Sequence, residues 1–262
     1  MTPVAELLRY RFLFEQMVRR ELRQKYQGSL LGIAWYVVNP LVLMGAYYLV
    51  FAVALKPGFE HEAYPLFLLV GLTVWIFFSQ SLLAASSSLL DQGALIRKAR
   101  FPRETIPAAA VAVQLVTFLV VLAIVAVLTV AVRGTLDAPL VLLPALLVAL
   151  AAFVVGLALV VSVLHAYYRD VGPILGAALL PWFFVSPIFF APADIVESEP
   201  ARDALTWLNP VAPFIIAVRD VLYGGVWPSA AMIVYVLVAA VVALTAGLAL
   251  FRRMSAELAV VV

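Results

Sequence analysis

The chain has 262 residues, of which 66% are hydrophobic and 12% charged, with a formal net charge of +2 and no cysteine. Soluble domains carry about 45–50% apolar and about 25% charged residues, so this composition excludes a soluble domain and indicates an integral membrane protein. Uncharged runs of about 20 residues are typical of membrane-spanning helices, whereas strands of a membrane barrel alternate over about ten residues. Without cysteine, disulfides, thiolate metal sites and a cysteine nucleophile are also excluded.

Residues 2–28 are predicted to form an amphipathic helix, because large apolar side chains and arginines separate onto opposite sides at about 100° per residue. The two sets are Leu7, Tyr10, Phe14, Met17, Val18 and Leu22 against Arg9, Arg19, Arg20 and Arg23. A basic amphipathic helix lies in the headgroup plane of the inner leaflet. We therefore expect an interface helix here; a solvated charged tail is the alternative.

Six apolar segments are expected to span the bilayer as helices. They are residues 33–55, 65–83, 106–132, 140–164, 174–191 and 230–251. Residues 192–229, between the fifth and sixth spans, hold an apolar stretch broken by Pro210 and Pro213. At about 14 residues it is too short to cross about 30 Å of hydrocarbon, but it suits a re-entrant helical hairpin on the external side. The prediction is an all-α, single transmembrane domain covering residues 1–262.

Basic residues set the expected orientation, because short cytoplasmic loops are enriched in Lys and Arg. Residues 89–105 form the most basic loop, between the second and third spans. With both termini in the cytoplasm, 13 of the 17 basic residues lie inside; those left outside are Lys56, Arg133, Arg202 and Arg219. We therefore expect cytoplasmic termini in a multi-pass protein of the inner membrane.

Several motifs are missing from the sequence. It contains no GxxxxGK[ST] phosphate loop, no HExxH helix and no GxSxG elbow. The predicted spans carry almost no ionisable side chains, which disfavours an ion-coupled carrier or a membrane enzyme with paired carboxylates. The two histidines, His61 and His165, fall in loops on opposite predicted sides and do not indicate a metal site. What remains is a membrane pathway that is energised by another protein.

Four segments, in this order, resemble the transmembrane subunit of ABC-2-type exporters of lipid-linked polysaccharide: RRELRQKYQGSLLGIAWYVVNPLV, GALIRKARFPRETIP, YYRDVGPIL and LNPVAPFIIAVRDVLYG. Within that family the chain is most similar to O-antigen exporter permeases, with capsule and teichoic acid exporter permeases as near relatives. The resemblance implies a homodimer in contact with membrane lipids and bound to two separately encoded ATPase subunits, which hold ATP and magnesium. No cofactor in this chain and no nucleic acid partner are implied.

The resemblance also implies a short coupling helix near residues 91–98 that docks on the ATPase. Apolar Leu95 and Ile96 would insert into a groove while Arg97 and Lys98 fix the orientation; a solvated basic loop is the alternative. A second inner loop could brace the ATPase or the interface helix, or be a simple turn. The residues assigned to ATPase coupling are Asp91, Leu95, Ile96, Arg97, Lys98, Arg103, Arg169 and Asp170.

A conduit for a sugar polymer is expected to offer aromatic faces without fixed charge, because the C–H faces of sugars stack on aromatic rings. The candidate channel-lining residues, on the first and fifth spans, are Tyr36, Tyr47, Tyr48, Trp182, Phe183 and Phe184. An interfacial aromatic belt or ordinary core packing is the alternative. For residues 192–229 the resemblance implies an external gate, with a surface flap or a docking site for an envelope partner as alternatives. The gate candidates are Asn209, Pro210, Arg219 and Asp220.

Two other functions remain open. The chain could belong to an ABC-2 exporter of a drug or small lipid, which would handle shorter substrates. It could instead be a membrane scaffold without transport of its own, in which case no ATPase would copurify with it.

Overall fold

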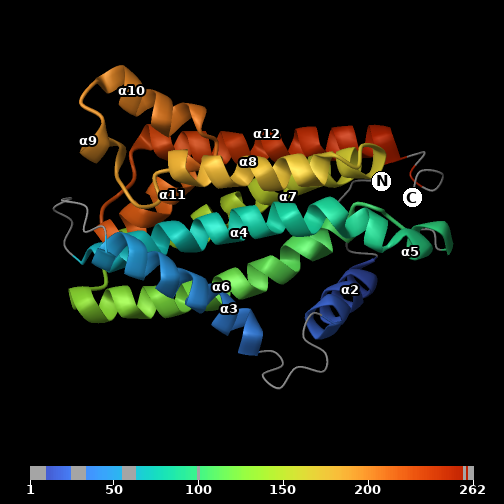
Figure 1. The fold of residues 1–262 in the computed structure, drawn as a ribbon, viewed down its shortest axis with the longest axis horizontal. Coiled ribbons are helices and arrows are strands. Elements are labelled where there is room, and N and C mark those ends of the chain that lie inside the picture. Colours follow the sequence, from blue (N-terminus) through green and yellow to red (C-terminus); the bar gives the residue numbers. More distant parts are fainter. Residues whose placement is uncertain (1–9, 25–33, 55–62, 99–100, 256–257, 259–262) are drawn as a thin grey trace.

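The structure, a computed structural model, describes residues 10–24, 34–54, 63–98, 101–255 and 258. Every regular element in these residues is a helix, as the sequence predicts (Figure 1). In chain order the elements are α2 (Arg11–Gln24), α3 (Trp35–Tyr48), η2 (Leu49–Ala54), α4 (Tyr64–Asp91), α5 (Gly93–Lys98), α6 (Thr105–Arg133), η3 (Ala138–Leu142), α7 (Leu143–Tyr167), α8 (Val171–Val185), α9 (Pro192–Ile195), α10 (Glu199–Asp203), η4 (Ala204–Leu208), α11 (Ala212–Arg219), η5 (Asp220–Gly224) and α12 (Ala230–Met254).

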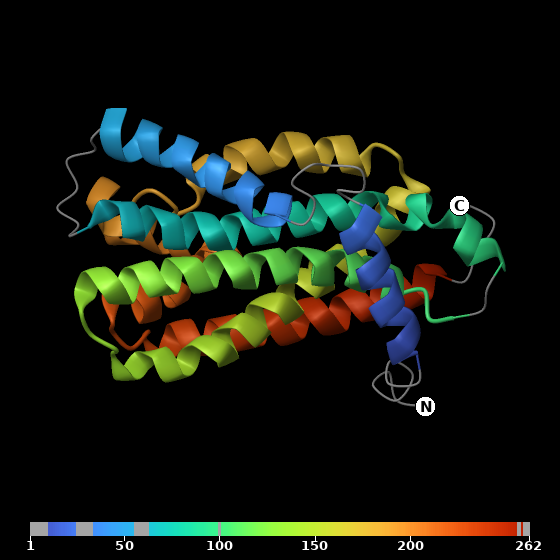
Figure 2. The ribbon, with the colours of Figure 1, turned by 90° about the horizontal axis from the view of Figure 1, so that it is seen from below.

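The long helices α4, α6, α7 and α12 run side by side along the longest axis of the molecule (Figures 1 and 2). Helix α5 and the end of α12 lie at one end of this bundle, and α9 and α10 lie at the other. Helix α2 crosses the bundle near the α5 end rather than running along it (Figure 2). We call these the α5 end and the α9 end.

Four helical segments among the described residues are long and apolar enough to cross a membrane: α4, α6, η3 with α7, and α12. The pieces 199–208 and 212–224 meet at 99° and could count together as a fifth. Helix α8 is apolar but has only 15 residues. These helices make the chain a multi-pass membrane protein.

Helix α4 extends to Asp91, well beyond residue 83, where the predicted second span ends. Three serines of α4 donate to carbonyls three or four residues earlier. Ser79, near the end of the predicted span, donates to Trp75 at 2.9 Å; in the extension, Ser86 donates to Leu83 and Ser88 to Ala85, both at 2.7 Å. These local bonds satisfy the hydroxyls, so the helix continues through a polar stretch. All three serines are buried within the protein.

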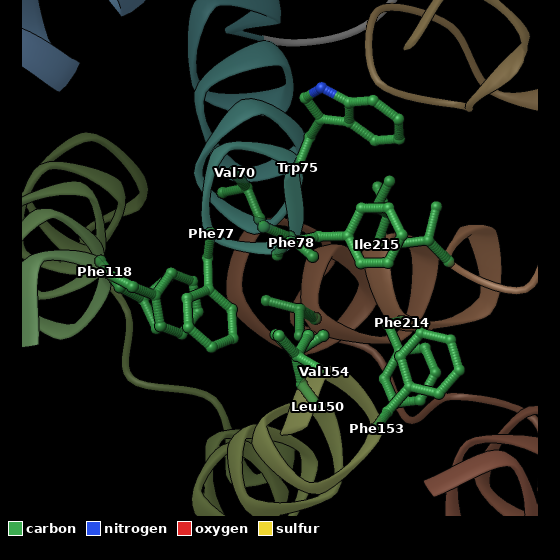
Figure 3. Packing of buried hydrophobic residues seen from close by; sticks show 14 of the residues in the cluster. Val70, Trp75, Phe77, Phe78, Phe118, Leu150, Phe153, Val154, Phe214 and Ile215 are labelled. Carbon is green, nitrogen blue, oxygen red and sulfur yellow. The ribbon is translucent and has the colours of Figure 1, made fainter. Parts of the chain in front are cut away.

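The main core contains α11 as well as the long helices. Phe77 of α4 stacks on Phe118 of α6 with ring centroids 4.6 Å apart, and Phe153 of α7 stacks on Phe214 of α11 at 4.7 Å (Figure 3). Ile215 of α11 lies against the same cluster. Helix α11 is therefore packed inside the bundle.

Helices α7 and α12 approach each other backbone to backbone. A Cβ atom added to Gly156 would overlap the backbone of Ala243, and one added to Gly247 would overlap the carbonyl of Gly156. Small residues allow such close approach between helices in membranes. The contact makes α12 part of the bundle, although most of its surface faces outward.

A second core lies at the α5 end and joins α2, α4, α5, α6, α7 and α12. Its buried members are Met17, Leu89, Ile96, Ile106, Ala109, Leu159, Val163, Ala166, Phe251 and Leu258. Helix α2 contributes its apolar side to this core, while Arg19, Arg20 and Arg23 are exposed. Residues 2–9 and 25–28 of the predicted interface helix lie outside the described residues.

Candidate functional site

Helix α8 ends at Val185, whereas the predicted fifth span continues to residue 191. Proline disfavours helical geometry in the residue before it and cannot donate a backbone hydrogen bond. Ser186, which precedes Pro187, is accordingly extended, with φ −82° and ψ 144°. Pro181, by contrast, lies inside the helix. The break after residue 185 leaves backbone carbonyls that the helix no longer uses.

Side chains from α4 and α11 donate hydrogen bonds to the carbonyls that follow α8. The guanidinium of Arg219 donates to the carbonyls of Pro187 at 2.8 Å and Ile188 at 2.7 Å, and the Tyr64 hydroxyl donates to that of Phe189 at 2.8 Å. Arg219 is only 5% exposed, and its guanidinium lies 3.7 Å from the centre of the Phe67 ring. The planar fork of arginine suits two adjacent carbonyls and an aromatic face at once. Arg219 is thus buried inside the protein, with its guanidinium bonded to the segment that follows α8.

A second polar network joins the end of α8 to the turn before α11. The Trp182 indole donates to the Asn209 side-chain oxygen at 2.9 Å, and the Asn209 amide donates to the Ser186 hydroxyl at 2.9 Å. The same Asn209 oxygen also accepts from the backbone of Val211 at 3.2 Å. Asn209 is only 7% exposed. It therefore holds the turn before α11 and also bonds to Ser186, the first residue after α8.

Pro210 and Asp220 complete the set of gate candidates. Pro210 is half-buried in the turn, directly after Asn209. Asp220 is half-buried at the start of η5, where the backbone carbonyl of Asp220 accepts from Val226 at 2.9 Å. Asn209 and Pro210 thus lie in the 99° bend, and Arg219 and Asp220 lie in the helical piece that follows it.

Aromatic side chains of α3, α4 and α8 meet beside this break. The Tyr47 and Phe183 rings have centroids 5.0 Å apart, and Trp75 lies 5.8 Å from Phe183 and 6.2 Å from Trp182. Phe184 is half exposed, at 50%, and contacts Phe183 edge to face at 5.1 Å. The first and fifth predicted spans therefore do bring aromatic rings together.

The aromatic candidates differ from one another in exposure. Phe183 is buried within the core, so it supports the cluster from behind instead of facing an open path. Tyr48 is half-buried, and the side chain of Tyr36 lies outside the described part of the chain. Phe184 and the half-buried Trp182 and Tyr47 are the candidates with accessible surface.

Four side chains of this site are not among the sequence candidates: Tyr64, Phe67, Trp75 and Ser186. Trp75 contacts both Trp182 and Phe183 within the aromatic cluster. Ser186 could have been found, because a hydroxyl beside a proline within an aromatic run signals a helix break with a local hydrogen bond. Tyr64 carries no comparable local signal.

The coupling candidates lie at the α5 end. Arg97 and Lys98 are exposed on α5, Leu95 is half-buried, and Asp91 accepts a hydrogen bond from Ser87 at 2.8 Å. Ile96 is only 3% exposed and belongs to the second core. Its expected insertion into a partner's groove does not fit this burial, because the side chain already packs within its own chain.

The remaining coupling candidates also include both exposed residues and one that is bonded within the chain. Arg103 is half-buried and donates to the backbone carbonyl of Ser255. Arg169 and Asp170 are exposed in the turn between α7 and α8. His165 accepts a hydrogen bond from the backbone of Gly172 at 2.9 Å and so closes that turn. Arg169 and Asp170 are thus accessible to a partner, whereas Arg103 is already bonded.

The site offers aromatic faces and hydrogen-bonded polar groups at a helix break. Among the described residues, no group of three or more His, Cys, Asp and Glu side chains is placed to hold a metal ion. Irregular backbone at membrane depth is tolerated where it is buried in protein or lines a cavity, and broken helices recur in transporters. The fold and the site are those of a multi-pass helical membrane protein. Helix α8 is broken after Val185, and α11 is packed inside the bundle.

Comparison with known proteins gives the family. A model of the ABC-2 type transporter family matches residues 13–223, and the chain belongs to this family. It is 30% identical over 256 residues to the O-antigen export system permease protein RfbA of Myxococcus xanthus, covering 98% of this chain and 97% of that protein. Two proteins of the same description from Klebsiella pneumoniae are 26% and 27% identical, over 82% of this chain.

Proposed function

We propose that the chain is the permease subunit of an ABC exporter that carries a lipid-linked polysaccharide of the O-antigen type across the bacterial inner membrane. The observation that carries the proposal is the 30% identity to an O-antigen export permease along 98% of the chain. A match of that length includes the interface helix, the α5 end, the aromatic cluster and the bent segment together. The similarity is therefore to a whole permease and not to one shared motif.

The energy would come from a separate ATPase, which holds ATP and magnesium. Membership of the ABC-2 family and the missing phosphate loop both support this division of labour. Two permease copies and two ATPase copies are the assembly that the family resemblance implies. The exposed basic residues Arg97 and Lys98 of α5, with Arg169 and Asp170 of the neighbouring turn, form the surface that we assign to the ATPase.

In this proposal the α5 end faces the cytoplasm and the chain crosses the membrane six times. The spans are α3 with η2, α4, α6, η3 with α7, α8, and α12, while α10 to η5 form a re-entrant hairpin. The basic residues of α2, α5 and the end of α12 support this orientation, because they gather at the same end of the bundle.

The conduit would lie between the two permease copies, with α3 and α8 facing it. Phe184, Trp182 and Tyr47 supply the aromatic surface on which sugar rings can stack and move. The external gate would be the segment from Asn209 to Asp220, which hydrogen bonds hold against the end of α8. This arrangement connects the gate directly to the wall of the conduit.

The test is to coexpress the chain with a candidate ABC ATPase subunit from the same organism and to reconstitute the purified complex in lipid nanodiscs. We expect the ATPase to copurify and its ATP hydrolysis to rise when lipid-linked glycan is added. Export of glycan to the cell surface should be lost when the gene is deleted and return when it is restored. A permease that copurifies with no ATPase would point to a scaffold, and stimulation by a small lipid alone would point to a lipid exporter.

A further inference from the structure

Three polar contacts join the segment after α5, and the end of α7, to the end of α12. Arg252 and Glu104 form an ion pair with nitrogen and oxygen 3.0 Å apart. The Arg103 guanidinium donates to the carbonyl of Ser255, and the Tyr167 hydroxyl donates to that of Met254 at 2.6 Å. These partners are 87 to 152 positions apart in sequence. We call this set the C-terminal contact.

Apolar packing lies beneath the C-terminal contact. Phe251 and Leu258 have no exposed surface, and they share the second core with Ile96 of α5 and Met17 of α2. The buried side of α5 therefore rests on the same cluster as the last turn of α12. A displacement of α5 would disturb this cluster unless the end of α12 moved with it.

A simpler interpretation is that Arg103 and Tyr167 only cap a helix. The last carbonyls of a helix lack intrahelical partners, and nearby residues or water usually satisfy them. Here, however, the two donors come from separate segments: Arg103 follows α5, and Tyr167 ends α7. The ion pair of the adjacent Glu104 with Arg252 adds to the Arg103 contact. Capping alone requires neither the ion pair nor donors from both turns.

The rest of α12 is joined to the bundle along its length. Gly247 and Gly156 bring the backbones of α12 and α7 into direct contact. Close-packed helices transmit a displacement because the interface has no free volume to absorb it. A push at α5 would thus reach α7 and α12 together.

We propose that the C-terminal contact transmits the movement of α5 to α12, with Arg103, Glu104 and Arg252 as positioning residues that do not touch the ATPase. This rests on the proposed function, in which α5 meets the ATPase. It replaces the expectation that Arg103 faces the ATPase, because the guanidinium is bonded within its own chain. The residues that carry the ATPase contact are then Arg97 and Lys98, and those that convey its movement lie behind them.

Charge reversal tests the ion pair. Arg252→Glu and Glu104→Arg are compared with the double swap and with Arg253→Glu, an exposed neighbour of Arg252. We expect each single variant to copurify with the ATPase and to hydrolyse ATP, but to export about five-fold less glycan per ATP, the factor that roughly 1 kcal/mol represents. The double swap should restore most of the export, and Arg253→Glu should change little. Melting curves of each complex, together with the milder Glu104→Gln, separate loss of coupling from loss of fold.

The outcomes distinguish this inference from the proposed function. Unchanged export per ATP in the single variants, or loss of the ATPase from them, would overturn the positioning role. A wild-type complex that neither binds an ATPase nor exports glycan would overturn the proposed function instead. A cross-link adds a second test, because the chain has no cysteine of its own. Cysteines at positions 104 and 252, joined by a short bifunctional maleimide, should leave export intact; its loss would mean that the two segments must separate.

Discussion

The indole of Trp182 and the side-chain amide of Asn209 are hydrogen-bonded at 2.9 Å, which joins the aromatic cluster of α8 to the turn that begins α11. Ser186 takes part in the same network, since its hydroxyl accepts from Asn209 and donates to the carbonyl of Trp182 at 2.8 Å. Trp182, which is assigned to the conduit, is therefore hydrogen-bonded directly to Asn209, which is assigned to the gate. The two regions are expected to move as one unit.

Replacing Asn209 with Ala should destabilise the permease and impair export together. The substitution removes the acceptor of the Trp182 indole N–H and the donor to the Ser186 hydroxyl, which keeps only its bond to the Trp182 carbonyl. Losing these partners in a buried site costs about 1–3 kcal/mol. Trp182→Phe removes the indole N–H but keeps an aromatic ring. In a double-mutant cycle measured by thermal unfolding in detergent, the combined variant should lose less stability than the sum of the two single losses. Additive losses would show that the two side chains are not coupled.

Arg219→Met should destabilise the protein more than Arg219→Lys. Methionine leaves two carbonyls of the break without a donor, at a cost of about 2 kcal/mol or more, whereas lysine can still donate to one of them. Tyr64→Phe removes the third donor and should have a smaller effect. Limited proteolysis in the segment 186–198 and thermal unfolding would measure the loss, with Arg253→Lys as a surface control. Equal stability of all four variants would contradict the role assigned to Arg219.

The sequence predicts the helical membrane class because long uncharged runs leave few other structures for the backbone. The predicted fifth span runs through Pro187 to residue 191, whereas α8 ends at Val185, two residues before this proline. The sequence could not predict that Arg219 binds the carbonyls of Pro187 and Ile188, since periodicity identifies the face of a helix but not a partner that lies 32 or 31 positions away. Likewise, α5 is only six residues long, too short for its pattern to reveal that Ile96 turns inward while Arg97 turns outward.

Substitutions on the two sides of α5 should therefore have different effects. Ile96→Asp places a carboxylate in the second core, so we expect the permease itself to lose stability and expression. Arg97→Glu with Lys98→Glu changes only exposed positions, so the fold should survive while less ATPase copurifies. Melting temperature and the amount of bound ATPase are measured for both. A normally folded Ile96→Asp variant that merely fails to bind the ATPase would restore the original assignment of Ile96 to docking.

Gly156→Val should separate α7 from α12. A side chain at this position overlaps the backbone of Ala243, so the helices must move apart or bend, which typically costs about 1–3 kcal/mol. Ala246→Val is a matched control, because Ala246 lies on the exposed side of α12 close to the contact. The Gly156 variant should melt at a lower temperature and, because the packing of α12 supports the C-terminal contact, should also export less glycan per ATP. If the variant loses stability but keeps its export per ATP, then the contact between α7 and α12 at Gly156 stabilises the fold without taking part in coupling.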